Sequence, residues 1–167
     1  MRREPPGSDS RDAILALQEF GGWIKNADTK ATILVAATSV VVVALLSRTD
    51  LVIRTVRADV SSRWIVGLLL VATIICLTVL AVCVYQSVRP RKMNFGFSRF
   101  AWPSVAELDS APVSFSSSTF EAEAWAQSYA LALIARQKFK WFNRALITFW
   151  LSLLFFAVLV VVLQLPH

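Results

Sequence analysis

The chain has 167 residues, of which 56% are hydrophobic and 17% charged, and it carries a formal net charge of +6. A soluble domain of this length has too small a core to bury so much apolar sequence, so the composition indicates an integral membrane protein and excludes a large catalytic domain. We interpret the positive charge as a determinant of topology and of contact with anionic lipids, and not as a nucleic-acid site.

The N-terminal part of the chain precedes any long apolar stretch. Residues 1–11 are expected to form a disordered tail. In residues 12–30, apolar side chains recur at helical spacing, which predicts an amphipathic helix that lies at the membrane interface or docks on the last helix of the chain. The pair Gly21 and Gly22 weakens this helix and favours a kink at the membrane surface.

Two charge-free apolar stretches follow, at residues 31–47 and 64–88. About 20 residues of helix cross a hydrocarbon core of about 30 Å, so both stretches predict transmembrane helices. The first is the weaker of the two, because it is short and contains small polar residues. The external connection at residues 48–63 mixes apolar and charged side chains at helical spacing and predicts a short interfacial helix on the outer side of the membrane.

The second half of the chain begins with a predicted cytoplasmic loop at residues 89–117. Ser118 and Glu121 then have the spacing of a capping box, in which each side chain satisfies a free amide at the start of a helix. Neither proline nor glycine interrupts the chain from there to Leu165. The sequence therefore predicts one helix of about 45 residues, consisting of a cytoplasmic arm at 118–144 and a third span at 145–165. Its expected packing residues in the arm are Phe120, Trp125, Tyr129, Leu133, Ile134 and Phe139.

The distribution of lysine and arginine predicts the orientation of the chain. Five of these residues precede the first span, four lie in the first connection, eight lie between the second span and the start of the third, and none follows the third span. The positive-inside rule places the N-terminus and the long middle segment in the cytoplasm and the C-terminus outside. We therefore expect an all-α, multi-pass membrane protein, with three transmembrane helices and a long C-terminal helix extending into the cytoplasm.

The sequence offers no recognisable catalytic constellation. The only histidine is His167, the last residue, and there is no glycine-rich phosphate loop, no cluster with metal-ligand spacing, and no nucleophile beside a plausible base. We expect a protein that is not an enzyme, with no catalytic residues, no metal site and no resident cofactor.

One candidate functional pair, Asp28 and Lys30, lies at the threshold of the first span. Ionisable groups at the edge of the hydrocarbon usually face protein or water, so Asp28 is expected to seek a cationic partner. Two residues apart on a helix, Asp28 and Lys30 do not face each other, so each needs a partner elsewhere. The alternative carries equal weight: Lys30 snorkels to the lipid headgroups and Asp28 is solvated.

A second candidate is the basic stripe of Arg136, Lys140 and Arg144, at four-residue steps on one face of the last helix. Lys138 lies on a different face. The stripe has the chemistry to pair with Asp28, to bind a lipid phosphate or to bind a nucleotide phosphate, and chemistry alone favours lipid.

Arg99 is embedded in the aromatic segment 95–102, which has the chemistry to stack a nucleobase. A phenylalanine-rich strip beside a membrane more often packs against it.

The residues that surround these candidates resemble a known family. The run WIKNADTKAT at 23–32 is similar to the signature of the Pycsar transmembrane effector family, which places an aromatic residue a short gap before Ala-Asp-x-Lys-Ala. Residues 89–91 with 94–97 resemble its proline and aromatic-glycine segment, and residues 135–139 resemble its Arg-x-Lys-aromatic approach to the final span. The similarity covers roughly residues 20 to 165 in order. The chain departs from the pattern in having Asn before Phe-Gly, and it has no recognisable soluble domain for cyclic nucleotides.

The resemblance implies an antiphage effector that disrupts the inner membrane, in abortive infection, when a partner pyrimidine nucleotide cyclase makes cyclic CMP or cyclic UMP. The other implied partners are membrane lipids and further copies of the chain. Ligand sensing would come from residues 89–140 or from another polypeptide. The candidate residues for ligand binding or gating are Asp28, Lys30, Arg99, Arg136, Lys138 and Lys140.

Two other functions remain open from the residues alone. One is a structural or regulatory membrane subunit that recruits a cytoplasmic partner through the arm. The other is a small constitutive ion channel, which the near absence of polar pore-lining residues in the spans disfavours.

Overall fold

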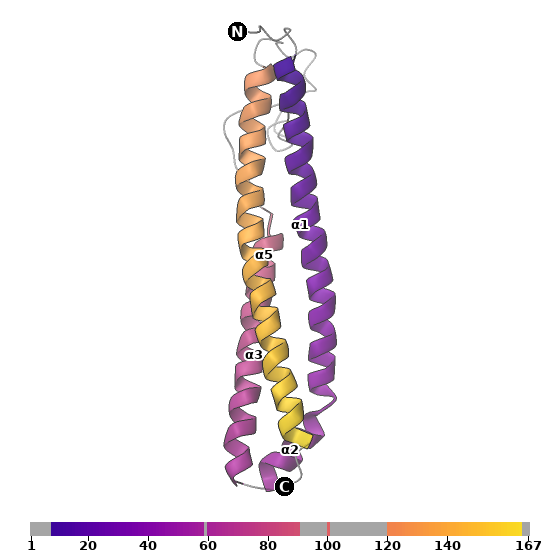
Figure 1. The fold of residues 1–167 in the computed structure, drawn as a ribbon, viewed down its shortest axis with the longest axis vertical. Coiled ribbons are helices and arrows are strands. Elements are labelled where there is room, and N and C mark those ends of the chain that lie inside the picture. The colour runs from indigo at the N-terminus through magenta and orange to yellow at the C-terminus, as the bar shows by residue number, and fades with distance from the viewer. Residues whose placement is uncertain (1–7, 59, 91–99, 101–119, 165–167) are drawn as a thin grey trace, which may run out of the picture. The chain divides into compact units, whose positions relative to one another are not determined.

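The structure is a computed structural model that describes residues 8–58, 60–90, 100 and 120–164. Every regular element in those ranges is an α-helix (Figure 1): α1 (Ser8–Leu46), α2 (Thr49–Ala58), α3 (Val60–Val88) and α5 (Phe120–Gln164). Three segments are long and apolar enough to cross a membrane, namely Arg11–Leu46, Arg63–Val88 and Phe120–Gln164. The predicted all-α membrane protein with three spanning helices and a long C-terminal helix is thereby confirmed.

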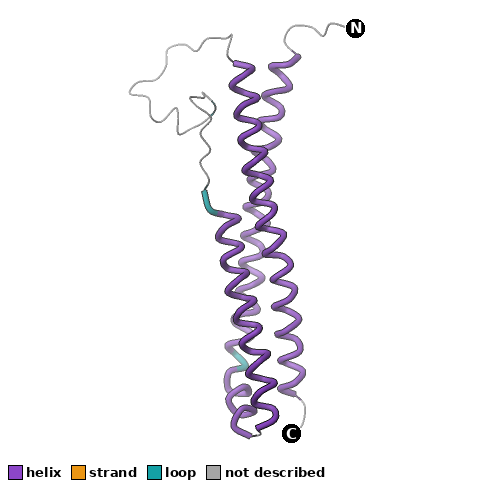
Figure 2. The backbone as a smooth tube through the Cα atoms, turned by 90° about the vertical axis from the view of Figure 1, so that its left-hand side faces the viewer, coloured by secondary structure: helices purple, strands orange, loops and turns teal. Residues whose placement is uncertain are grey.

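The first helix is longer than either segment that the sequence suggested for this region. α1 has 39 residues and continues through Gly21 and Gly22 (Figure 2). Both glycines are exposed, and a Cβ atom added to either would meet no neighbouring atom within 4 Å. Each glycine costs a helix only about 1 kcal/mol relative to alanine, which packing against other helices readily outweighs.

The connection between the first two spans contains the ten-residue helix α2. Asp50 in its first turn and Arg57 in its last turn complement the helix dipole. The Arg63 Nε–H donates a hydrogen bond of 3.0 Å to the carbonyl oxygen of Val56, which satisfies an acceptor left free near the end of α2. α2 therefore packs against the beginning of α3.

The 45-residue helix α5 begins at Phe120 and has Glu121 and Glu123 in its first turn, where acidic groups are favourable. The Phe120 ring meets the edge of the Phe100 ring at a centroid distance of 5.4 Å. Ser118, the other half of the predicted capping box, lies outside the described residues.

One repeat of buried and half-buried side chains runs along α5 at alternating spacings of four and three. Its members are Ala124, Ser128, Leu131, Ala135, Lys138, Phe142, Ala145, Phe149, Ser152, Phe156 and Leu159. Such a repeat of 3.5 residues is typical of helices that pack side by side as in a coiled coil. We call this line of residues the α5 seam. It continues without a break from the polar half of the helix into the apolar half.

The chain divides into two compact units, which are described separately. The arm unit comprises Met1–Ala27 and Pro90–Lys138, and the span unit comprises Asp28–Arg89 and Phe139–His167. In the span unit, α1, α3 and α5 pack around a core of Leu34, Leu80, Cys83 and Ala145. This core is flanked by Leu77, Val84, Trp141, Phe142 and Phe149.

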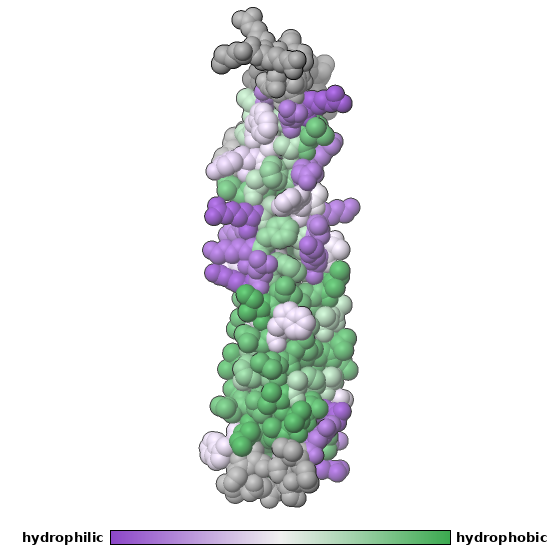
Figure 3. Space-filling model, in the orientation of Figure 1, coloured by the Kyte–Doolittle hydropathy of each residue, from purple (hydrophilic) through white to green (hydrophobic). Residues whose placement is uncertain are grey.

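The interior of the span unit also holds buried hydroxyl groups, and the helices themselves satisfy them. Thr73 Oγ1 donates to the carbonyl oxygen of Leu69, and Ser152 Oγ to that of Phe149, both at 2.8 Å. Large apolar side chains such as Val40 and Leu68 are exposed instead, and the surface of the span unit is predominantly hydrophobic (Figure 3). Satisfied hydroxyls inside and apolar side chains outside suit a unit surrounded by lipid.

Candidate functional site

The two helices of the arm unit lie side by side (Figure 1) and are joined through small side chains. Among its described residues, the buried ones are Ala13, Ala27, Ala124, Ser128, Ala130, Ala135 and Lys138. The single Ser128 hydroxyl proton is shared between two carbonyl oxygens, that of Ala124 at 2.8 Å and, more weakly, that of Ala13 on the neighbouring helix at 3.4 Å. Small side chains at a helix interface let the two backbones approach closely, so this unit is a close-packed helix pair.

Lys138 is the exception to this small-residue pattern, because it is only 5% exposed. It occupies a position of the α5 seam, three residues after Ala135, whereas Arg136 and Lys140 are exposed. A buried ammonium group is tolerated only where its charge is compensated. Lys138 therefore belongs to the packing of the arm unit, and Arg136 to its surface.

Large aromatic side chains remain on the surface of the arm unit. Trp23 is 52% exposed, Trp125 45% and Tyr129 61%, and the Trp23 Nε1–H donates to Glu19 Oε1 at 3.0 Å. The prediction that Trp125 and Tyr129 pack inward is wrong. Each lies one position beyond a buried small residue, Ala124 or Ser128, and close helix packing selects the small residue for the interface.

The exposed aromatics of α5 share a face with a cation. Trp125, Tyr129 and Arg136 follow at steps of four and seven residues, which places them along one side of the helix. Exposed aromatic groups beside a guanidinium are typical of binding surfaces. Sequence reasoning identified Arg136 but missed the two aromatics. The signal that would have found them is the repeat of small residues at Ala124, Ser128 and Ala135.

In the span unit, the candidate residues lie near the start of the apolar segments. Asp28 is half-buried, and its backbone carbonyl oxygen accepts a 3.1 Å hydrogen bond from Thr32 Oγ1, while Lys30 and Lys140 are exposed. The guanidinium carbon of Arg144 lies 4.9 Å from the centroid of the Trp141 ring, within the range of a cation–π interaction.

The structure thus describes five of the six candidate residues, and Arg99 lies outside the described residues. Lys138 and Arg136 both belong to the arm unit, but Lys138 is buried in the α5 seam and Arg136 is exposed on the surface. Within the described parts of the chain, no group of three or more His, Cys, Asp or Glu side chains is arranged to hold a metal ion.

Comparison with known proteins identifies the family. The model of the Pycsar effector protein domain matches residues 13–164, a range that begins within α1 and ends at the last residue of α5, and so covers nearly all of the three spanning segments. No curated protein and no solved structure gives a significant match. The family predicted from the residues around Asp28 and Arg136 is confirmed. The chain belongs to the Pycsar effector family and is a membrane effector of cyclic-nucleotide-linked antiphage defence.

Proposed function

We propose that this effector disrupts the integrity of the bacterial inner membrane when a partner pyrimidine nucleotide cyclase makes cyclic CMP or cyclic UMP during infection. The observation that carries the proposal is the family match over residues 13–164 of a chain with three spanning helices. Loss of membrane potential arrests or kills the host cell before phage are released, which is abortive infection. The protein acts in this scheme without catalysing a reaction.

We place the nucleotide on the exposed face of Trp125, Tyr129 and Arg136. Aromatic rings stack on nucleobases, and a guanidinium binds phosphate through paired hydrogen bonds. The exposure of both rings and the steps of four and seven residues along α5 support this assignment. Lys140, which is also exposed, supplies further positive charge toward the membrane.

The continuity of α1 and α5 supports a mechanism by which nucleotide binding to the arm unit changes the conformation of the span unit. Both helices begin in the arm unit and end in the span unit, so a rotation or shift of one helix in the arm unit moves the same helix in the span unit. A ligand that prefers the active state a hundredfold shifts the equilibrium by about 2.7 kcal/mol. The active state is an assembly of several copies, in contact with membrane lipids.

The orientation follows the distribution of lysine and arginine, which places the N-terminus and the arm unit in the cytoplasm. Alkaline phosphatase, which is active only outside the inner membrane, tests this assignment when it is fused to either end of the chain. We expect activity from the C-terminal fusion alone. Activity from the N-terminal fusion would contradict the orientation and would remove the arm unit from contact with a cytoplasmic nucleotide.

The decisive experiment measures membrane potential with a voltage-sensitive dye in cells that express the full chain. Cyclic CMP, cyclic UMP, cyclic AMP and cyclic GMP are added separately. We expect depolarisation with a pyrimidine nucleotide only, and its loss in Arg136→Gln but not in Arg11→Gln, a matched change of an exposed arginine in the same unit. Absence of depolarisation with every nucleotide, despite correct insertion, would favour a membrane subunit that recruits a cytoplasmic partner.

A further inference from the structure

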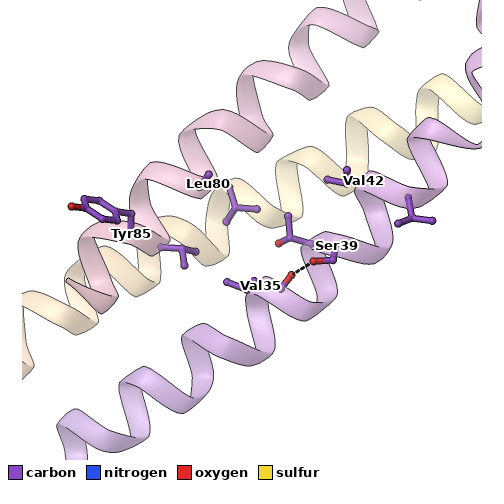
Figure 4. A pocket seen from close by; sticks show the side chains of 9 residues that line it. Val35, Ser39, Val42, Leu80 and Tyr85 are labelled. Atoms are coloured by element: carbon purple, nitrogen blue, oxygen red, sulfur yellow. Dashed lines mark hydrogen bonds between the residues drawn. The ribbon is translucent and has the colours of Figure 1, made fainter. Parts of the chain in front are cut away.

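An open groove lies between α1 and α3 in the span unit (Figure 4). Its volume is about 460 Å³, within the range of about 300–1,000 Å³ found for ligand pockets. Val35, Ser39 and Val42 line it from α1, and Leu80, Ala81 and Tyr85 line it from α3. Leu80, which is 1% exposed, forms the floor.

The groove presents an apolar surface although two hydroxyl groups lie along it. Ser39 Oγ donates to the carbonyl oxygen of Val35 at 3.0 Å, and Thr38 Oγ1 donates to that of Leu34 at 2.7 Å. Each hydroxyl proton is therefore committed to its own helix, as is usual for serine and threonine in membrane helices. The remaining lining is mainly aliphatic, so the groove matches a hydrocarbon chain better than a polar ligand.

A tyrosine lines one end of the groove, and an arginine that is not part of the lining follows it along α3. Tyr85 is 62% exposed, and Arg89, one helical turn later, is also exposed. The Arg89 N–H donates to the Tyr85 carbonyl oxygen at 2.9 Å, so helical geometry continues and Ala81, Tyr85 and Arg89 follow one face of α3. A tyrosine and an arginine at the end of a spanning helix are the residues that meet the interface and the lipid phosphates.

We propose that the groove binds one acyl chain of an anionic phospholipid, whose phosphate is bound by Arg89 beside Tyr85. The apolar groove matches the tail, and the guanidinium at its end matches the phosphate. A helix of a second copy is the competing occupant. In the same membrane orientation, however, that copy would bring its own Arg89 to this level, and like charges would meet. Charge complementarity therefore favours the lipid. The proposal does not depend on the nucleotide trigger.

Native mass spectrometry of the full chain, purified in detergent, tests this site with added phosphatidylglycerol or phosphatidylcholine. We expect one tightly retained phosphatidylglycerol. Ala81→Trp fills the groove and should lower retention at least about tenfold. Ala157→Trp is the matched control, because Ala157 is exposed on α5 outside the groove, and it should retain lipid as the unmodified chain does.

Arg89→Gln tests the charged end without filling the groove. Because one basic residue near the membrane surface is worth about 1 kcal/mol toward anionic lipid, retention of phosphatidylglycerol should fall about fivefold, with little change for phosphatidylcholine. Arg89 is exposed at the end of α3, so this variant is expected to fold normally. Retention of lipid by Ala81→Trp at the level of the unmodified chain would overturn the proposal. So would a loss of self-association in Ala81→Trp with lipid retention unchanged, which would assign the groove to a second copy.

Discussion

Ser128 on α5 and Ala13 on α1 form a direct contact between the two helices of the arm unit, in which the serine hydroxyl donates to the alanine carbonyl oxygen at 3.4 Å. The same hydroxyl donates at 2.8 Å to the carbonyl oxygen of Ala124 within its own helix. Ser128 is 1% exposed and Ala13 is fully buried. A side-chain oxygen reaches a backbone oxygen of the neighbouring helix only when the helices are close, so this position requires a small residue.

Substitutions of Ser128 should separate the effect of size from that of the hydrogen bond. Ser128→Ala should lower the stability of the arm unit by about 0.5–1.5 kcal/mol, because a modest hydrogen bond is lost. Ser128→Leu should cost about 1–3 kcal/mol or more, because it overpacks the interface. Amide hydrogen exchange of α1 and α5 in the full chain measures both effects. Tyr129→Leu, at the exposed neighbouring position, is the control, and an equal effect there would contradict the close-packed interface.

Replacing Gly21 and Gly22 with alanine should stiffen α1. Both positions are helical, exposed and sterically open, so each substitution should stabilise the helix by about 0.5–1 kcal/mol. Hydrogen exchange should slow in the first half of α1. Gly67→Ala, also in open space but in α3, should leave the arm unit unchanged. Unchanged exchange in the double variant would show that the glycines do not limit the stability of α1.

Removing the charge of Asp28 should impair the effector. Asp28 is half-buried at the beginning of the first apolar segment, where an ionised carboxylate is retained for a specific interaction. Asp28→Asn should reduce nucleotide-dependent depolarisation about tenfold, which corresponds to the loss of an interaction of about 1.4 kcal/mol by this half-buried carboxylate. Asp12→Asn, an exposed aspartate of the same helix, should respond normally. An Asp28→Asn protein with full toxicity and full assembly would remove this motif from the mechanism.

The Arg144 and Trp141 pair should contribute measurably to the stability of the span unit. Their 4.9 Å separation predicts a coupling free energy of about 0.5–1 kcal/mol. A double-mutant cycle with Arg144→Gln and Trp141→Leu, measured by unfolding in detergent, isolates this value from the packing of Trp141 on the core. Additive effects of the two substitutions would show that the pair is not coupled.

Much of the membrane architecture could be predicted from the sequence, because a helix that crosses the hydrocarbon core must be apolar over about 20 residues, and both properties are visible in the sequence. The uninterrupted run up to Leu165 also predicted the length of α5, since only proline or glycine would have broken it. The continuity of α1 was not predicted, because the local cost of Gly21 and Gly22 is visible in the sequence whereas the packing that outweighs it is not.

The interface of the arm unit was harder to predict, for a related reason. Trp125 and Tyr129 have large aromatic rings that would bury more area than Ala124 and Ser128, but the close approach of two helices selects small side chains. The groove beside Leu80 depends on the pairing of α1 with α3, and no periodicity within one helix reveals it.

The interior of the span unit has a consequence for how the membrane fails. Leu34, Leu80, Cys83 and Ala145 fill its centre, and the hydroxyls of Thr73 and Ser152 are bonded within their own helices. The described centre of the span unit in a single copy is therefore packed with apolar side chains and with hydroxyls that are already hydrogen-bonded. If the effector disrupts the membrane as proposed, such a packed centre favours leakage where molecules meet each other or disturb the bilayer, and current should then rise more steeply than in proportion to the number of molecules per unit area. Sparse expression would then be harmless, and damage would begin at a threshold density.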